Sequence, residues 1–102
     1  MSYNIKLLPI ALSDLRKAKK WYQEINSDLA LDFKVEINKE LDYIRLNPTH
    51  YQKKHKHLRQ SKVIRFPYCI FYLVHVKHKA VIVLGVLHTS RNPKIAKNRI
   101  KK

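Results

Sequence analysis

Four basic side chains flank the two most apolar stretches of the sequence and carry the chemistry that it offers. Lys62 and Arg65 precede the first stretch, and His88 and Arg91 follow the second. Histidine exchanges a proton near neutral pH, while lysine and arginine neutralise phosphates or carboxylates. RNA cleavage through the ribose 2′-hydroxyl needs a base for that proton, cations beside the phosphate and an acid for the leaving oxygen. In a ribonuclease, these four residues would be the catalytic candidates.

The two apolar stretches, residues 68–76 and 80–87, are expected to form a hairpin at the centre of the fold. Both are rich in β-branched and aromatic residues, and a short basic turn joins them. Neither alternates cleanly with polar residues, which indicates central strands covered at least partly on both faces. The hairpin would bring the basic residues that flank it to one end of the sheet. Gly85, the only glycine, predicts a bulge or a close approach.

Apolar spacing predicts a short strand and two helices before this hairpin. Residues 3–8 alternate until Pro9, so a strand is expected there, and its pairing partner cannot be read from the sequence. Apolar residues at steps of three and four predict one helix over about residues 11–25 and a second over about 29–44, which stops at Asn47-Pro48. Because the break between them is short, the helices should pack as an antiparallel pair.

The remaining segments are more basic. A loop over residues 49–57 is expected to lead into an edge strand over residues 58–66, where charged side chains discourage unwanted pairing. After the hairpin, Asn92 and Pro93 are typical of a helix start, so a short terminal helix is expected up to Ile100. The predicted order is strand, helix, helix, three strands and a helix.

The charge of the chain is divided between its two halves. All seven carboxylates lie between Asp14 and Asp42, residues 51–102 contain fourteen lysines and arginines and no acid, and the net charge is +15. This asymmetry predicts an anionic partner, which can be nucleic acid, a nucleoprotein, an acidic protein segment or a membrane surface. The candidate target-binding residues are the basic side chains near the hairpin ends and in the preceding loop: His88, Arg91, Arg65, Lys53, Lys54, Lys56 and Arg59.

Several other classes of protein lack support in the sequence. There is no apolar run of about 18 residues and no signal-peptide pattern at the N-terminus, so we expect a cytoplasmic protein without a membrane partner. The single cysteine, Cys69, lies in an apolar stretch and is expected to be a core residue. The histidines offer no complete ligand set, so we expect neither a metal nor another cofactor.

Four short motifs follow one another along the chain. They are a helical pair with Trp21-Tyr22, the Asn47-Pro48 ending, Arg65-Phe66-Pro67-Tyr68, and Val-Leu-His88-x-x-Arg91-x-Pro93. Together they resemble the RelE/ParE superfamily of small toxins from bacterial type II toxin–antitoxin systems, which includes plasmid stabilisation proteins. The resemblance covers nearly the whole chain. It implies one α+β domain over residues 1–102, in the order β-α-α-β-β-β-α, with an antiparallel sheet faced by the helical pair.

The resemblance implies one of two targets. RelE-like members cleave mRNA on the ribosome, and they are expected to use basic residues on the sheet with a tyrosine or histidine near the C-terminal end. ParE-like members poison DNA gyrase. When the Tyr-x-x-x-Tyr of the third strand is aligned without gaps, Cys69 stands at the nuclease arginine position, and residues 92–102 contain no tyrosine. We therefore favour a ParE-like toxin that inhibits growth through gyrase, with the ribosome-dependent mRNA endonuclease as the alternative.

The partners are less constrained than the fold. The resemblance implies an acidic cognate antitoxin that wraps the toxin in a hetero-oligomer. Trp21 and Tyr22 are the candidate partner-binding residues, although aromatic pairs of this kind usually pack in the core. A non-toxic nucleic-acid-binding module, or an adaptor for acidic proteins, would use the same basic surface, so both interpretations stay open.

Overall fold

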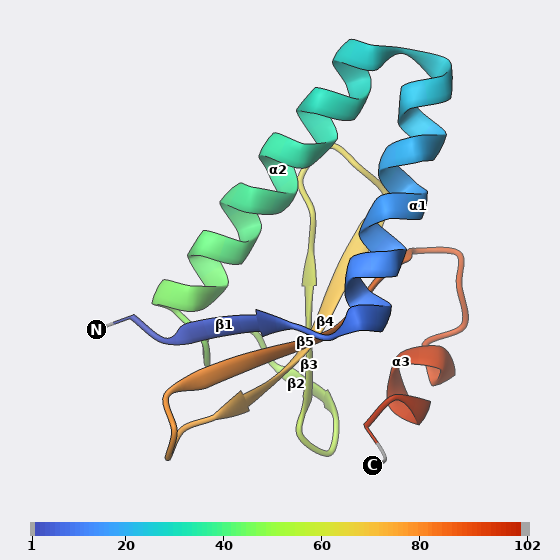
Figure 1. Cartoon of the computed structure of the whole chain (residues 1–102). Coiled ribbons are helices and arrows are strands. Elements are labelled where there is room, and N and C mark those ends of the chain that lie inside the picture. The colour runs from blue at the N-terminus through green and yellow to red at the C-terminus, as the bar shows by residue number, and fades with distance from the viewer. Residues whose placement is uncertain (1, 101–102) are drawn as a thin grey trace.

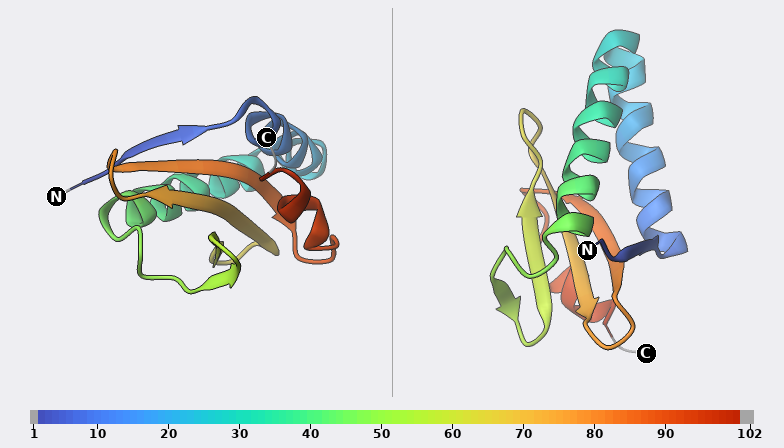
Figure 2. Two further views of the ribbon diagram at one scale, coloured as in Figure 1. Left: turned by 90° about the horizontal axis from the view of Figure 1, so that it is seen from below. Right: turned by 90° about the vertical axis from the view of Figure 1, so that its left-hand side faces the viewer.

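The computed structural model describes residues 2–100, which form a five-stranded sheet with a helical pair on one face (Figure 1) and a short helix on the other (Figure 2). The elements along the chain are β1 (Asn4–Leu7), α1 (Pro9–Ile25), α2 (Ser27–Leu46), β2 (Lys53–His55), β3 (Leu58–Lys62), β4 (Tyr68–His75), β5 (Ala80–His88) and α3 (Lys94–Asn98). The predicted order is confirmed, and β2 is an additional strand in the segment predicted to be a loop. Within residues 2–100, no helix is long and apolar enough to cross a bilayer.

Helices α1 and α2 form the antiparallel pair that their apolar spacing predicts. Helix α1 begins at Pro9, whose fixed φ suits the first helical turn. Helix α2 follows Asn26, whose side chain accepts a hydrogen bond of 2.8 Å from the backbone N–H of Asp28. The tip of the pair projects beyond the sheet (Figure 1), so Ile25, predicted to be in the apolar stripe, is instead 59% exposed.

The strands are ordered β1-β5-β4-β3-β2, with the predicted β4–β5 hairpin in the middle. The sheet is mixed, which corrects the expectation of an antiparallel sheet, because β1 pairs in parallel with β5 and places Asn4 opposite Ala80. Parallel pairing needs a long connection, and the intervening helices and strands provide it. Strand β3 was predicted to be an edge strand, and this is wrong. Strand β2 pairs with its outer side, so β2 is the edge strand.

Gly85 has both of the roles predicted for it. The register between β4 and β5 shifts by one residue beside it, where Leu84 is the extra residue of a β-bulge. A Cβ atom on Gly85 would also lie 2.5 Å from Nη1 of Arg99, so the guanidinium would have to move. The missing side chain therefore leaves room for Arg99 to reach the sheet.

The central strands are covered on both faces, as their composition predicts. The helical pair covers a core in which Phe33 and Tyr72 are among the largest fully buried side chains. On the opposite face, Ala96 of α3 packs in a second apolar cluster with Cys69, which is 3% exposed and a core residue as predicted. The sheet thus separates two cores, and α3 closes the smaller one.

A partly buried ion pair fastens the end of α3 to α1. Nη1 of Arg99 lies 2.7 Å from Oδ2 of Asp14, and the two side chains are only 15% and 13% exposed. The same Nη1 donates to the Leu84 carbonyl oxygen at 3.1 Å, and the same Oδ2 accepts from the backbone N–H of Val86 at 3.0 Å. These contacts join α1, β5 and α3 at one point.

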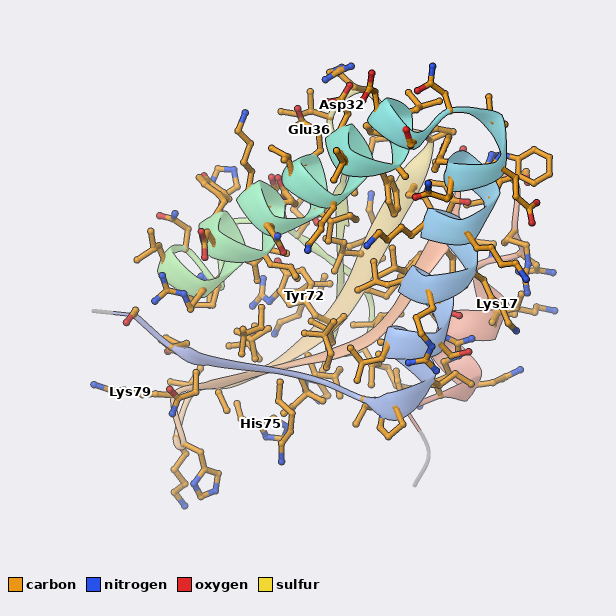
Figure 3. All side chains as sticks on the ribbon, turned by 45° about the horizontal axis from the view of Figure 1, so that its top comes forward. Lys17, Asp32, Glu36, Tyr72, His75 and Lys79 are labelled. Atoms are coloured by element: carbon orange, nitrogen blue, oxygen red, sulfur yellow. The ribbon has the colours of Figure 1, made fainter. Side chains whose placement is uncertain are left out.

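Tyr72 lies beneath the helical pair (Figure 3), and its hydroxyl has no hydrogen-bond partner within the described chain. Burial disfavours the phenolate and raises the pKa of Tyr72 to about 12. In the unfolded chain this pKa returns to about 10. The contribution of the Tyr72 hydroxyl to the free energy of unfolding is therefore fully present below pH 10. It is lost as the pH rises towards 12, because the unfolded chain releases the proton first.

Tyr72→Phe should therefore be neutral at pH 7, or stabilising by up to about 1 kcal/mol, because it removes a buried hydroxyl that lacks a partner. It should also reduce the loss of stability between pH 10 and pH 11.5. Thermal melting of the parent and the variant at pH 7 and across this alkaline range measures both effects. A variant that melts well below the parent at pH 7 would show that the hydroxyl has a stabilising partner.

Candidate functional site

Basic side chains gather where β4 begins and β5 ends, as predicted for the hairpin. Tyr68 is opposite His88 in the register, and their rings meet edge to face with centroids 5.3 Å apart. The chain then turns back, with the Thr89 backbone N–H donating to the Pro67 carbonyl at 2.8 Å and the Arg91 N–H donating to the His88 carbonyl at 2.9 Å. These bonds fix the backbone from which His88 and Arg91 project.

His88 and Arg91 line two cavities of about 220 Å³ each. On the α3 side of the sheet, Lys62 of β3 joins them. On the α1 side, Lys17 and Trp21 join them. We call the four basic residues Lys17, Lys62, His88 and Arg91 the basic rim. The structure thus brings together three of the four residues predicted as catalytic candidates.

Arg65 does not belong to the basic rim, which corrects the prediction. Its guanidinium is directed to α2, with Nη2 3.4 Å from Oδ2 of Asp32 and Nη1 3.7 Å from Oε2 of Glu36. The backbone of Arg65 has a φ of 74°, so the loop after β3 turns sharply at this residue. The helical carboxylates draw the side chain towards the helical pair, whereas Lys62 lies in the cavity on the other face.

The other predicted target-binding residues lie at the opposite end of β3 from Lys62. Lys53, Lys54 and Lys56 belong to β2 and to the turn that follows it, and their side chains are exposed. Arg59 is less available, because its Nη1 donates to two backbone carbonyl groups at 2.6 and 3.4 Å. The lysines therefore form a separate basic surface on a hairpin at the sheet edge.

Hydrogen bonding assigns the tautomer of His88. Its Nδ1 accepts a hydrogen bond of 3.0 Å from the backbone N–H of Ser90. The neutral ring therefore carries its proton on Nε2. In this state Nε2 donates to a ligand and does not remove a proton from a 2′-hydroxyl. The local backbone thus favours a binding role for His88 over the role of a general base.

Other groups near the basic rim do not replace that base. Burial raises the pKa of the Tyr68 phenol, which therefore stays protonated at neutral pH. Asp14 borders the α1-side cavity but is paired with Arg99. Cys69, at the position where RelE-like nucleases are expected to carry an arginine, is buried, and its Sγ accepts a hydrogen bond from Gln60 at 3.1 Å. The cavities offer cations and hydrogen-bond donors.

Arg91 is available to a ligand. Its side chain is exposed and makes no hydrogen bond or ion pair within residues 2–100. It does not hold the terminal helix, because Asn92 caps that helix by accepting a hydrogen bond of 2.9 Å from the Lys94 N–H. Arg99 then fastens the far end of the helix to Asp14. The guanidinium of Arg91 can therefore pair with an external carboxylate or phosphate.

Only one of the two predicted partner-binding aromatics is accessible. Trp21 is 60% exposed, which corrects the expectation that it packs in the core. Tyr22 is 8% exposed, and its ring lies 5.2 Å from that of Phe33 and 5.1 Å from that of Phe66. Trp21 and Lys17 are four residues apart and share one face of α1. This spacing is the signal that could have placed Lys17 beside the predicted residues.

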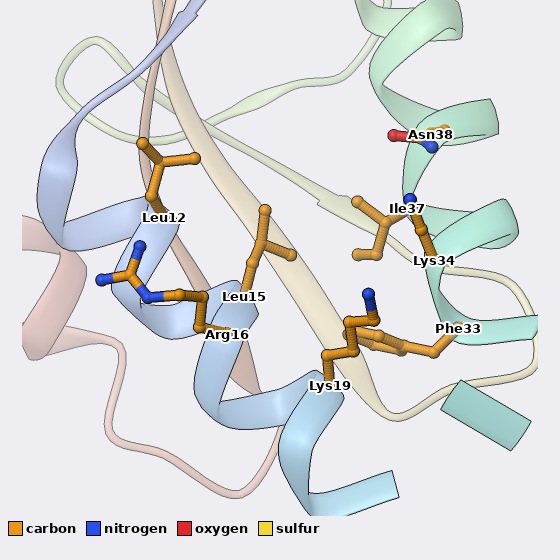
Figure 4. Close-up of a pocket in the computed structure, with 8 residues that line it drawn as sticks. All are labelled: Leu12, Leu15, Arg16, Lys19, Phe33, Lys34, Ile37 and Asn38. Carbon is orange, nitrogen blue, oxygen red and sulfur yellow. The ribbon is translucent and has the colours of Figure 1, made fainter. Parts of the chain in front are cut away.

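An apolar groove between α1 and α2 is a separate surface (Figure 4). Its volume is about 220 Å³. Its lining combines apolar side chains with basic and amide ones: Leu12, Leu15, Phe33, Ile37, Arg16, Lys19, Lys34 and Asn38. We call it the helical groove. An amphipathic segment with an apolar face and acidic flanks matches this lining. Within the described residues, no cluster of three or more histidine, cysteine or acidic side chains could hold a metal ion.

Three solved structures share the architecture of this chain. The chromosomal ParDE toxin–antitoxin system from P. aeruginosa matches with a TM-score of 0.72 and 15% identity, over 85% of this chain and 96% of that one. A free E. coli toxin RelE mutant matches with a TM-score of 0.69 and 20% identity, over 99% of this chain and 100% of that one. The RelBE2 toxin–antitoxin complex from Mycobacterium tuberculosis matches with a TM-score of 0.60 and 15% identity, over 86% of this chain and 99% of that one. The fold is thus that of the small toxins of toxin–antitoxin systems.

The sequence assigns the chain within this class. A family profile described as the ParE toxin of the type II toxin–antitoxin system, parDE, matches residues 5–93. The chain therefore belongs to the ParE toxin family, which confirms the resemblance noted in its motifs. No curated protein matches the sequence significantly.

Proposed function

We propose that this toxin inhibits bacterial growth by binding DNA gyrase through the basic rim, and that it does not cleave RNA. The hydrogen bond from the Ser90 N–H to Nδ1 of His88 carries the proposal, because it leaves Nε2 as a donor and deprives a nuclease of its base. Arg91, on the adjacent turn, supplies a free guanidinium that can fork to a carboxylate of gyrase or a phosphate of DNA. Lys17 and Lys62 extend the positive field on either side.

Two assays with purified protein separate the targets. Added to gyrase and DNA, the toxin should trap gyrase on DNA as protein-linked breaks, and it should leave ribosome-bound mRNA intact. The opposite result, mRNA cleavage at codon positions that is lost in His88→Ala, would establish the RelE-like alternative. That alternative has one observation in its favour, since Lys62, His88 and Arg91 line a single cavity. Inactivity in both assays would contradict both proposals.

We also propose that an acidic antitoxin neutralises the toxin and places an amphipathic segment in the helical groove. The basic side chains of the groove and the net charge of +15 support an acidic partner. Folding of a disordered segment onto this preformed surface would bury its apolar face against α1 and α2. Co-expression with the product of the neighbouring gene should then restore growth and yield a stable complex.

Leu12→Asp tests the groove directly. Leu12 lines it and is 44% exposed, so an aspartate there should weaken antitoxin binding about tenfold or more through lost apolar burial and repulsion. Ile10→Asp is the matched control, because Ile10 is 47% exposed on the same helix but does not line the groove. Titration calorimetry with the purified antitoxin measures both. Equal losses in the two variants would place the antitoxin elsewhere.

A further inference from the structure

A pocket of about 400 Å³ lies between α2 and the segments that precede β2 and follow β3. Its lining residues are Glu36, Lys39, Glu40, Tyr43, Tyr51 and Ile64. It shares none of these residues with the cavities of the basic rim and only α2 with the helical groove. We call it the α2 pocket. Its chemistry differs from that of the rest of the surface, because two carboxylates and two phenols line it.

The carboxylates of the α2 pocket belong to an acidic stripe along one face of α2. Asp28, Asp32, Glu36 and Glu40 follow one another at intervals of four residues, which places them in a row along the helix. Figure 3 shows Asp32 and Glu36 as neighbours in this row. Because residues 43–102 contain no acid, the row is a concentrated negative feature on a chain of net charge +15. It gives α2 a preference for positive partners.

Two of these carboxylates are buried, and their pairing is incomplete. Glu36 and Glu40 are 9% and 8% exposed. The contact of Glu36 with Arg65 is long, at 3.7 Å, and Arg65 is shared with Asp32. Burial and the nearby Glu40 carboxylate raise the pKa of the Tyr51 phenol, and Oε2 of Glu40 is shielded from solvent and has no partner within the described residues. A buried carboxylate oxygen without a donor is costly, so this position calls for a cationic donor.

Aromatic rings complete the lining. The rings of Tyr43 and Tyr51 lie 5.9 Å apart at an angle of 61°, and His50 packs edge-on against both. Phenol faces attract cations, and a guanidinium stacks on them better than an ammonium does because it is planar and weakly hydrated. Its five N–H donors can also reach two carboxylates at once. The combination therefore selects arginine over lysine.

We propose that the α2 pocket binds an arginine side chain of a protein partner, with Glu36 and Glu40 as ion-pair partners and Tyr43 and Tyr51 as stacking walls. A rotation of the Glu40 carboxylate would offer Oε2 to the incoming guanidinium. Ile64, 67% exposed at the pocket edge, adds an apolar contact for the same partner.

The test uses the purified full chain and N-acetyl-arginine amide as the probe, with the matching citrulline amide as a neutral isostere. Amide NMR spectra should show saturable shifts that centre on Glu40, Tyr43 and Tyr51 with the arginine probe and are absent with citrulline. The dissociation constant should rise at least tenfold in Glu40→Gln. Equal shifts with both probes, or no saturable shifts with arginine, would overturn the proposal.

A control variant and thermal melting separate recognition from a structural role of Glu40. Asp42→Asn is the matched control, because Asp42 is an exposed carboxylate of the same helix, 71% exposed in its side chain, outside the pocket lining. It should bind the probe like the parent. Glu40→Gln should melt at or above the temperature of the parent, since it removes a buried charge whose pairing is incomplete, while binding falls. A lower melting temperature with unchanged binding would assign Glu40 to the fold alone.

Discussion

Replacing Arg91 or His88 with alanine should restore growth to cells that express this toxin without its antitoxin. Arg91 projects from a turn fixed by backbone hydrogen bonds, and its side chain has no partner within residues 2–100. A lost charge-assisted contact of this kind costs about 2 kcal/mol, or roughly thirtyfold in affinity for the target. Colony counts after induction measure the toxicity, and gyrase trapping with purified protein measures the binding.

The basic residues of the β2–β3 hairpin provide the comparison for this prediction. Lys54→Ala should reduce toxicity far less, because an exposed lysine on an edge hairpin makes screened and replaceable contacts. Lys77→Ala, in the turn between β4 and β5, should leave toxicity unchanged. Thermal melting must show that every variant folds. If well-folded Arg91→Ala and His88→Ala both remain fully toxic, the basic rim is not the surface that meets the target.

Arg99→Ala should be the most destabilising single change described here. It leaves Asp14, which is 13% exposed, without its ion-pair partner, and it removes the hydrogen bond from α3 to the Leu84 carbonyl of β5. Breaking a largely buried pair by removing one partner costs about 3–5 kcal/mol, and the residual exposure of both side chains places the expected loss at about 2–4 kcal/mol. Urea unfolding followed by circular dichroism measures the change in the free energy of unfolding.

Two further variants test the cause of this loss. Gly85→Ala should have a similar effect, because its Cβ would displace the Arg99 guanidinium and lie 3.2 Å from Asp14. Arg45→Ala removes a long ion pair, at 3.7 Å, with the exposed carboxylate of Asp42 and should cost less than about 0.5 kcal/mol. A loss for Arg99→Ala no larger than that for Arg45→Ala would mean that α3 is held by its apolar contacts alone.

Local patterns in the sequence predict much of the fold. The two helices, the central hairpin and the bulge at Gly85 follow from apolar periodicity, β-branched content and a lone glycine, and the structure has all of them. The pairing of β1 with β5 could not be predicted, because strand composition does not name a partner in a distant segment. The additional strand β2 was also missed, since its lysines match a solvated loop as well as an edge strand.

In the candidate site, too, the placements that depend on local patterns were predictable and those that depend on distant contacts were not. His88, Arg91 and Lys62 meet as predicted, because all three flank the ends of neighbouring strands whose register follows from the hairpin. The position of Arg65 differs from the prediction because the carboxylates that attract it, Asp32 and Glu36, are on α2, 33 and 29 residues away in sequence. The tautomer of His88 depends on a backbone N–H two residues later. Contacts of these two kinds cannot be read from residue types alone.

The ion pair between Asp14 and Arg99 joins residues 85 positions apart, and the parallel pairing of β1 with β5 is almost as distant in sequence. Neither the ion pair nor the strand pairing can form during translation until the C-terminal part of the chain has been made. At about 5–20 residues per second, roughly 4–17 s pass between synthesis of the two ends of this ion pair. Until β5 is made, β1 has no strand to pair with, and until α3 is made, α1 has no terminal helix to hold. The nascent chain is therefore incompletely folded for seconds, and all the residues of the helical groove are made before Lys62, His88 and Arg91 of the basic rim.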